Sequence, residues 1–404
     1  MATLFRNKKT WQRPSVSWML LDKLGGVHSF VANLLAHRLP DNLRYNAILE
    51  RNVQDLDDPS DGDLRANVSR VVFRLPLENY HSVLKRIARQ LPKGPGAIVS
   101  NDWLSLAVVA AQRTGKSVVY INHGDFSYYY DLAVQYQSTI DLYITYTEKM
   151  RDRLCELLPQ RKDDILLIPY GVEIPPRRKR SESEAIRLLY VGRLDRSKGV
   201  FDLPAIDARL RSAGVDTRWT LQGPGPAEAQ LRQAWGRASH VTWAGHSSME
   251  RVKEGYFEHD VLVMPSRAEG LPVALLEGMA SGCVPVVSDL PSGIPEIVEN
   301  GVSGFRVPPG DIDGFADAIA TLAADGAARG SMSEEAAARI EARFNIVDRA
   351  PQYQQAIATA ADSEPRWPGR RVYFGSRLDK PWIPNVAVTS ARSLRRRLHE
   401  LRRS

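Results

Sequence analysis

Cysteine is scarce in this chain of 404 residues, which contains only Cys155 and Cys283. Two cysteines so far apart support neither a disulfide framework nor a zinc site, and they fit a reducing compartment. Long apolar runs are missing as well: Val16–Leu21 is broken by Ser17 and is too short for the core of a signal peptide. No run approaches the roughly 20 residues of a membrane span. We therefore expect a cytoplasmic protein.

Complete cofactor and metal motifs are also missing. Gly115-Lys116-Ser117 imitates the end of a Walker loop, but alanine occupies position 110, where that motif needs its first glycine. The glycine-rich turn at 223–228 has Glu228 in place of the third glycine of a dinucleotide fingerprint. Asp61-Gly-Asp63 spells a DxD metal-diphosphate motif, but it lies in an acid-rich loop with no strand leading into it. We predict no metal and no cofactor.

Acidic and basic residues balance in most of the chain. Residues 362–404 hold eleven Lys or Arg and four Asp or Glu, which accounts for the whole net charge of +7. Within this tail, Leu394, Leu398 and Leu401 fall at i, i+4 and i+7 with arginines on the flanks. Such a segment is typical of a solvated tail, of a helix packing on its own protein, or of an interfacial helix drawn to anionic lipid.

The rest of the chain alternates short apolar runs with helix-like segments, which indicates parallel α/β sheets. Its 43% hydrophobic content suffices for two domains with full cores. The clearest predicted strands are 16–21, 43–49, 97–100, 117–121, 186–191, 241–245, 261–264 and 284–288. We predict helices at 28–39, 103–113, 273–281 and 344–361, and a helix cap at Asp313.

The most informative stretch is 261–288, where a strand, a loop, a helix and a second strand follow one another. Glu269 lies on the loop, Pro272 suits the first helical turn, and Glu277 follows about two turns into the helix. Ligands of parallel sheets bind at the carboxyl ends of the strands. Two carboxylates at this spacing suit two parts of one extended polyhydroxyl ligand, and free amides at the helix start suit a phosphate.

A second motif follows the strand 186–191. Gly192-Arg193-Leu-Asp-Arg-Ser-Lys198-Gly199 places an arginine and a lysine at a strand end before a helix. These side chains form a cationic clamp for a diphosphate.

Together these residues resemble a known family. Glu-x7-Glu between Pro-Ser and Ala-Ser-Gly-x-Val-Pro, with Gly-Arg-Leu-x3-Lys-Gly upstream, is similar to the donor-site signature of the retaining nucleotide-sugar glycosyltransferases of family four. The resemblance implies the GT-B fold: α/β, with two Rossmann-like domains whose parallel sheets face each other across a cleft. It covers Val16 to about Ala361 and leaves the basic tail outside.

Read in this way, the chain divides into an acceptor-side domain at 1–174, a donor domain at 175–345, a closing helix at 346–361 that crosses back, and the basic tail at 362–404. The domains are joined by a charged, proline-led linker at 175–184. The resemblance assigns catalytic roles to Glu269 and His123, the latter touching the transferred sugar. It assigns donor binding to Gly25, Gly26, Arg193, Lys198, Glu269, Gly270, Leu271 and Glu277.

The implied function is transfer of a hexose from a nucleoside-diphosphate sugar to a hydroxyl acceptor with retention of configuration. UDP is favoured over GDP, and the acceptor is a saccharide or a lipid-linked sugar in polysaccharide, glycolipid or lipopolysaccharide synthesis. The tail would hold the enzyme at the inner face of the membrane; no nucleic acid is expected. The alternatives are a sugar-nucleotide epimerase of the same fold and a non-enzymatic protein that binds anionic surfaces.

Overall fold

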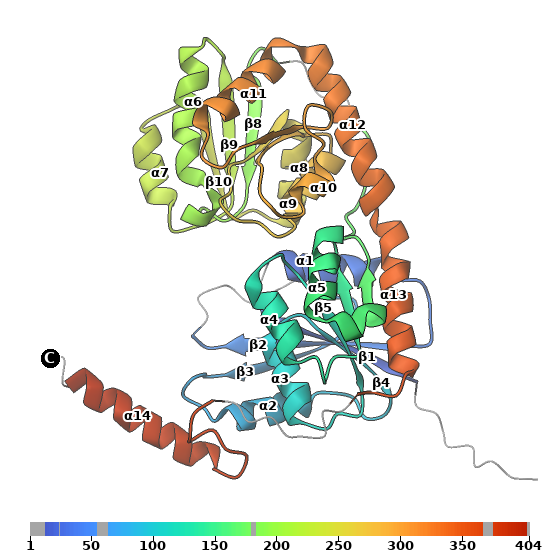
Figure 1. Cartoon of the computed structure of the whole chain (residues 1–404). Coiled ribbons are helices and arrows are strands. Elements are labelled where there is room, and N and C mark those ends of the chain that lie inside the picture. The colour runs from blue at the N-terminus through green and yellow to red at the C-terminus, as the bar shows by residue number, and fades with distance from the viewer. Residues whose placement is uncertain (1–12, 24, 55–63, 179–182, 367–374, 402–404) are drawn as a thin grey trace, which may run out of the picture. The chain divides into compact units, whose positions relative to one another are not determined.

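The computed structural model describes residues 13–23, 25–54, 64–178, 183–366 and 375–401. It divides into two compact units, of which the first combines Met1–Ile168 with Ala350–Ser404 and the second is Pro169–Arg349. The chain therefore leaves the first unit, builds the second and returns (Figure 1). The Asp61–Asp63 DxD spelling and part of the 175–184 linker lie outside the described residues.

The first unit is built on a seven-stranded sheet with the order β3-β2-β1-β4-β5-β6-β7, in which every pair is parallel. Its strands are β1 (Ser15–Leu21), β2 (Arg44–Asn52), β3 (Asn67–Phe73), β4 (Gly96–Ser100), β5 (Ser117–Ile121), β6 (Leu142–Thr145) and β7 (Ile165–Leu167). Both central strands β4 and β5 are buried along their whole length, as continuous apolar strands of a parallel sheet should be.

Helices cover both faces of this sheet. Those of the first unit are α1 (Gly26–Ala36), α2 (Tyr80–Ala88), α3 (Trp103–Ala111), α4 (Ser127–Gln135), α5 (Glu148–Leu157), the 3-10 helix η1 (Pro159–Asp164), α13 (Ile346–Asp362) and α14 (Asn385–Leu401). Apolar side chains of α2 to α5 form one core with the strands. On α1 and α13, Phe30 and Tyr353 pack edge to face at 5.2 Å between ring centroids.

The second unit has a six-stranded parallel sheet with the order β10-β9-β8-β11-β12-β13. Its strands are β8 (Ile186–Val191), β9 (Thr217–Gln222), β10 (Val241–Gly245), β11 (Val261–Met264), β12 (Val284–Ser288) and β13 (Phe305–Val307). Its helices are η2 (Arg196–Lys198), η3 (Val200–Asp202), α6 (Leu203–Ser212), α7 (Glu228–Trp235), α8 (Met249–Glu258), α9 (Val273–Ala280), α10 (Ile294–Ile297), α11 (Ile312–Ala324) and α12 (Gly326–Phe344).

Both sheets have the doubly wound order in which the direction of winding reverses at the first strand. The reversal falls between β1 and β4 in the first unit and between β8 and β11 in the second. Ligands of doubly wound sheets bind outside the carboxyl ends of the strands at this switch point. The topology therefore marks one candidate edge in each unit.

The predicted strands are confirmed, whereas several helix limits differ and a number of elements were not predicted. The helix predicted to reach Leu39 ends at Ala36, and α3 ends at Ala111, two residues before the predicted limit at Arg113. The cap before α11 is Asp311, whose side chain accepts from the Gly314 amide, so the prediction of Asp313 was wrong.

Other differences concern breaks between helices. Phe344 ends α12, and Asn345, with extended dihedral angles, separates it from α13, which begins at Ile346. The sequence interpretation gave no range for β3 or for the helices α2, α4, α5, α6, α7 and α8.

Candidate functional site

The switch point of the second unit brings two loops together. Parallel pairing of Val261 with Leu188 aligns β11 with β8, so the segments that follow them, 192–199 and 265–271, leave the same edge of the sheet. The Arg267 amide donates to the Ser197 carbonyl at 2.9 Å and ties the loops to each other.

Gly199 allows this close approach. Its φ is +65°, and a Cβ on it would lie 1.8 Å from the Pro265 carbonyl oxygen. A larger residue would therefore clash with the neighbouring loop and also occupy a left-handed conformation that side chains disfavour. The glycine of the Gly-Arg-Leu-x3-Lys-Gly motif is thus needed to hold Lys198 against the second loop.

Lys198 and Glu269 form an ion pair across these loops. The Lys198 ammonium donates to both Glu269 carboxylate oxygens at 2.8 Å, and the Ser266 hydroxyl donates to one of them at 2.7 Å. The Glu269 side chain is buried at 7% exposure, whereas that of Lys198 is 32% exposed. A partly buried, bidentate pair of this kind holds both side chains in one geometry. One side of the lysine remains accessible to a ligand.

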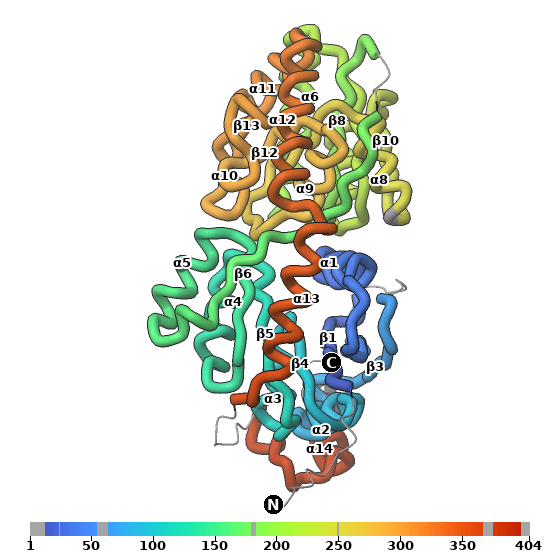
Figure 2. The backbone as a smooth tube through the Cα atoms, turned by 90° about the vertical axis from the view of Figure 1, so that its right-hand side faces the viewer, coloured from blue at the N-terminus to red at the C-terminus, as the bar shows by residue number. Residues whose placement is uncertain are grey.

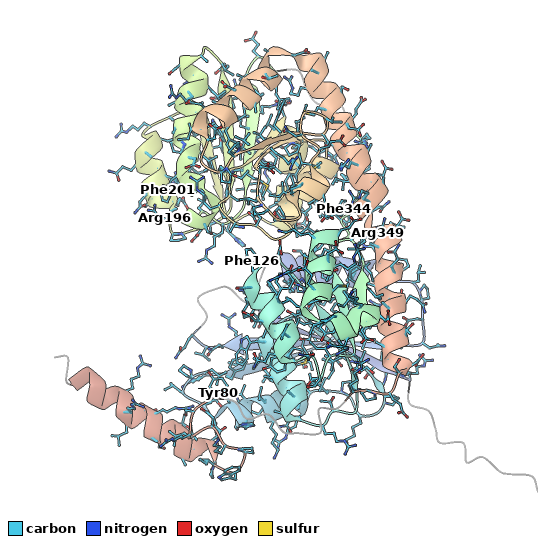
Figure 3. All side chains as sticks on the ribbon, in the orientation of Figure 1. Tyr80, Phe126, Arg196, Phe201, Phe344 and Arg349 are labelled. Atoms are coloured by element: carbon cyan, nitrogen blue, oxygen red, sulfur yellow. The ribbon has the colours of Figure 1, made fainter. Side chains whose placement is uncertain are left out.

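Arg193 is the second cation of the predicted clamp, and it is exposed. The Tyr190 hydroxyl donates to the backbone carbonyl of Arg193 at 2.8 Å, which fixes the backbone at this position. Arg196, on the same loop, stacks on Phe201 at 4.9 Å (Figure 3). The structure therefore keeps Lys198 and Arg193 as the cations at this edge and directs Arg196 onto an aromatic ring.

Glu277 lies in the middle of α9 and is half-buried. The Tyr256 hydroxyl donates to its carboxylate at 3.2 Å. Burial is the main cause that raises the pKa of Glu277 to about 7, opposed by the Tyr256 hydrogen bond and by Lys253. In the ligand-free protein this carboxyl group therefore changes charge near neutral pH.

The predicted start of α9 at Val273 is confirmed, and the helix ends at Ala280, one residue before the predicted limit. Pro272 is the N-cap, with φ −73° and ψ 112°, and the helix begins at Val273. The Pro272 carbonyl accepts the first helical hydrogen bond from the Leu275 amide at 3.0 Å. Pro272 itself has no amide hydrogen and the Leu275 amide is used within the helix, so Val273 and Ala274 carry the other amides of the first turn, beside Gly270 and Leu271.

His123 follows β5 at the carboxyl edge of the first unit, and protein groups engage both of its ring nitrogens. Its Nε2 lies 2.6 Å from the Asn101 Oδ1, and the Tyr146 hydroxyl bonds to its Nδ1. Because the Asn101 amide donates to the Met19 carbonyl, its Oδ1 must accept, so His123 carries its proton on Nε2. Burial lowers the pKa of His123 to about 3, which keeps the ring neutral near neutral pH.

Gly25 and Gly26 lie at the switch point of the same unit, after β1. Gly25 is the N-cap of α1, its carbonyl accepts from the Ser29 amide at 3.0 Å, and Gly26 is the first helical residue. A Cβ on Gly25 would meet no atom within 4 Å. The space around it is open to a close approach of the backbone, while its φ of 158° with ψ of 178° is a conformation that residues other than glycine rarely adopt.

Two buried carboxyl groups at this edge escaped the sequence interpretation. Glu50 near the end of β2 is fully buried, and neither carboxyl oxygen has a hydrogen-bond partner among the residues that the structure describes. Burial, reinforced by nearby Asp102, raises the pKa of Glu50 well above its usual value. Asp102 caps α3 by accepting from the Leu104 amide at 2.9 Å. The only available signal was a glutamate that interrupts the apolar run of β2.

The opposite edge of the first unit carries a groove of about 1280 Å³, lined by α13 and by residues before β2 and β6 such as Asp41 and Asp141. It lies at the amino ends of the strands and contains none of the predicted site residues. Over the part of the chain that the structure describes, no cluster of His, Cys, Asp or Glu could hold a metal ion.

Comparison with known proteins gives a family match over the region that contains Lys198, Glu269 and Glu277. Residues 185–325 match the family model described as glycosyl transferases group 1. The chain carries a group 1 glycosyltransferase domain. Arg193, Gly270 and Leu271 also lie within the matched range, whereas His123, Gly25 and Gly26 precede it.

Similar proteins extend this picture beyond the domain. The amylovoran biosynthesis glycosyltransferase AmsK of Erwinia amylovora is 34% identical over 171 residues, which cover 40% of this chain and 42% of that protein. The chain therefore spans about two fifths of the length of this curated relative. Sucrose-phosphate synthase from Thermosynechococcus elongatus is 20% identical over 86% of this chain and 99% of its own, with a TM-score of 0.69.

Anabaena HepE in complex with UDP-glucose matches 86% of this chain and 100% of its own at 18% identity and the same TM-score of 0.69. At these identities the structural matches show the fold alone. The glycosyltransferase domain thus belongs to a chain with the GT-B fold, built from two Rossmann-like units.

Proposed function

We propose that the protein is a retaining hexosyltransferase that uses a nucleoside-diphosphate sugar and a hydroxyl acceptor. One observation supports the proposal: the Lys198–Glu269 ion pair lies at the switch point of the sheet within the range that matches glycosyl transferases group 1, and Glu277 follows on α9, the helix that continues the Glu269 loop. Opposite charges at this edge suit a ligand with a diphosphate at its centre and hydroxyl groups at both ends.

Each side chain receives a role from its chemistry. Glu277 in its charged form accepts hydrogen bonds from the ribose hydroxyls, and Glu269 accepts from hydroxyls of the sugar. Lys198, partly exposed while paired, reaches the diphosphate together with Arg193 and stabilises the charge that develops as the phosphate leaves. The amides around Gly270 and Leu271 add neutral donors.

The Lys198–Glu269 ion pair also affects which group can set the anomeric configuration of the transferred sugar. Both oxygens of Glu269 accept from Lys198, which makes this carboxylate a poor nucleophile and a poor base. The leaving phosphate is then the group that takes the proton of the acceptor hydroxyl on the same face of the sugar. This mechanism gives retention without a covalent enzyme intermediate.

The first unit would supply the remaining contacts. We place Gly25 and Gly26 against the donor phosphates, because a Cβ at Gly25 would meet open space. His123 would act as a neutral positioning group for the sugar, since its low pKa excludes proton transfer by the ring near neutral pH. A sugar hydroxyl could bond to a ring nitrogen only by displacing Asn101 or Tyr146.

UDP is the favoured nucleotide, and a cell-envelope polysaccharide, glycolipid or lipopolysaccharide is the favoured product. Support comes from HepE, which was crystallised with UDP-glucose, and from AmsK, named for amylovoran biosynthesis. No helix in the described segments has the length and apolarity needed to cross a membrane. We propose that the enzyme works in the cytoplasm.

The test combines binding with turnover. Titration calorimetry with UDP and with GDP should show tighter binding of UDP, and a panel of UDP-sugars should show slow hydrolysis of one donor with release of UDP. NMR of the first-formed sugar should show the anomeric configuration of the donor. Binding of neither nucleotide would refute the proposal, and conversion of one UDP-sugar into another without release of UDP would establish the epimerase alternative.

A further inference from the structure

Tyr256 on α8 reaches the carboxylate of Glu277 from inside the second unit. Its hydroxyl donates to Glu277 Oε2 at 3.2 Å, and among the described residues this is the only hydrogen bond that the carboxylate receives. Tyr256 is buried, whereas Glu277 is half-buried, and the helices α8 and α9 that carry them lie side by side (Figure 2). The second oxygen, Oε1, therefore remains for a ligand.

The position of the Tyr256 ring is fixed by its packing. Gly278 follows Glu277 on α9, and a Cβ on it would lie 3.4 Å from the Tyr256 Cδ1 and 2.7 Å from the Leu262 Cδ2. The Cys283 thiol, just after α9, donates to the Tyr256 carbonyl at 3.0 Å. A buried ring packed this closely cannot turn away, so the direction of its hydroxyl toward Glu277 is set.

The Tyr256 hydroxyl keeps its proton at every pH near neutrality. Burial is the main cause that raises the pKa of Tyr256 well above its usual value. The same hydrogen bond is the largest of the effects that favour the ionised form of Glu277, whose pKa burial raises to about 7. Hydrogen bonds to an ionised carboxylate are shorter and stronger than those to a neutral one. The contact should therefore tighten when a nucleotide binds and Glu277 loses its proton.

The other titratable groups around Glu277 act more weakly than Tyr256. Lys253, one turn earlier on α8, lowers the pKa of Glu277, and Glu173 raises it, while these two side chains form an ion pair with each other. Glu269, on the loop before α9, is held in its own ion pair. The helix α12 also packs against α9, and its buried side chains do not titrate: they are Ala336, Ala337, Ile340 and Phe344.

We propose that Tyr256 is a positioning residue for nucleotide binding, which holds the Glu277 carboxylate in place for the ribose hydroxyls. The inference rests on the ribose contact proposed above for Glu277. Without the hydroxyl, the carboxylate would lose its one described donor and would keep its proton to higher pH. A residue that does not touch the nucleotide thus supports the one that does.

Tyr256→Phe tests this role, because it removes the hydroxyl and keeps the ring. The Kd of UDP should rise about 5-fold near pH 7, as loss of one hydrogen bond predicts. The midpoint of the pH dependence should move to higher pH, so the effect should be larger near about pH 6 than near about pH 8.5, where Glu277 is ionised in both proteins. Glu173→Gln should move the midpoint in the opposite direction, because it removes a negative charge that disfavours ionisation.

Tyr353→Phe is the matched control. Tyr353 is a buried tyrosine of the first unit whose hydroxyl donates to the Ile168 carbonyl at 2.8 Å, so its loss should lower the melting temperature and leave both the Kd of UDP and the pH midpoint unchanged. This comparison separates an effect on nucleotide binding from a general loss of stability.

A double variant completes the test. In a Glu277→Gln background, Tyr256→Phe should have no further effect on the Kd of UDP, because the two changes remove parts of one contact. An undiminished effect in that background, or an unshifted pH midpoint in Tyr256→Phe alone, overturns the inference. If Glu277→Gln weakens UDP binding and Tyr256→Phe does not, only the inference fails; if Glu277→Gln has no effect on UDP binding, the ribose contact fails and the inference with it.

Discussion

Replacing Glu277 by glutamine keeps the size of the side chain and removes its charge, so it tests the ribose-binding role directly. A hydrogen bond to a charged acceptor contributes about 1.5–3 kcal/mol. The Kd of UDP should therefore rise about 10-fold to 150-fold at a pH where Glu277 is ionised. The fold should persist, because α9 keeps its packing through Leu275, Leu276 and Met279, which are fully buried.

Because the pKa of Glu277 is raised, its ribose-binding role predicts that the Kd of UDP depends on pH. The folded protein without ligand holds the Glu277 proton up to about pH 7, above the usual carboxyl range, so UDP must bind the ionised form with release of a proton. Affinity should weaken as the pH falls through about 7, and the Kd should be about 10-fold higher near pH 6 than near pH 8. Glu277→Gln should lack this component.

Calorimetry of UDP binding at several pH values is the assay, with the variant serving to subtract the titration of UDP itself. Glu254→Gln is the matched control, because Glu254 is an exposed carboxylate on α8 paired with Arg251. Equal UDP affinities of the Glu277→Gln variant and the unaltered protein near pH 8, or identical pH profiles, would refute the ribose contact. A fall in melting temperature of the variant alone would point instead to a structural role.

Four other substitutions test roles that the structure makes distinct. Lys198→Ala should lower turnover and also lower the free energy of unfolding by on the order of 1–3 kcal/mol, because it leaves the buried Glu269 carboxylate without its cation. Arg193→Ala should lower turnover and leave the melting temperature unchanged, because Arg193 is exposed. Equal melting temperatures of the two variants would contradict the ion-pair argument. His123→Ala should reduce sugar transfer and leave UDP affinity unchanged, and loss of UDP binding would reject this assignment. In the unaltered protein, the pH profile of kcat should show no histidine step between about pH 6 and 7, since burial lowers the pKa of His123. Glu50→Gln should stabilise the protein in urea melts near pH 8 and have no effect near pH 4, because a carboxyl whose folded pKa is raised destabilises the native state only once the pH exceeds its unfolded pKa. A stability gain that does not vary with pH would argue against a protonated Glu50.

Much of the candidate site in the second unit could be predicted from the sequence, because it depends on the order of neighbouring elements along the chain. The strand β11, the loop with Glu269 and the helix with Glu277 follow one another within 28 residues, and the limits of β8, β10, β11 and β12 match the prediction. Continuous apolar runs bounded by proline and glycine are strong local signals. Helix ends were less predictable, because a cap is decided by which side chain reaches an amide, as Asp311 shows.

The contacts between distant segments belong to the tertiary structure. Lys198 and Glu269 are 71 positions apart and become partners only because β8 and β11 pair at the switch point. The burial that raises the pKa of Glu277, and the attachment of the tail to α2 through Asn79, likewise depend on elements that sequence order does not place together. The sequence by itself determined which residue types stand at the carboxyl ends of the strands; packing decided which of them meet, because burial and pairing depend on neighbours brought in from elsewhere in the chain.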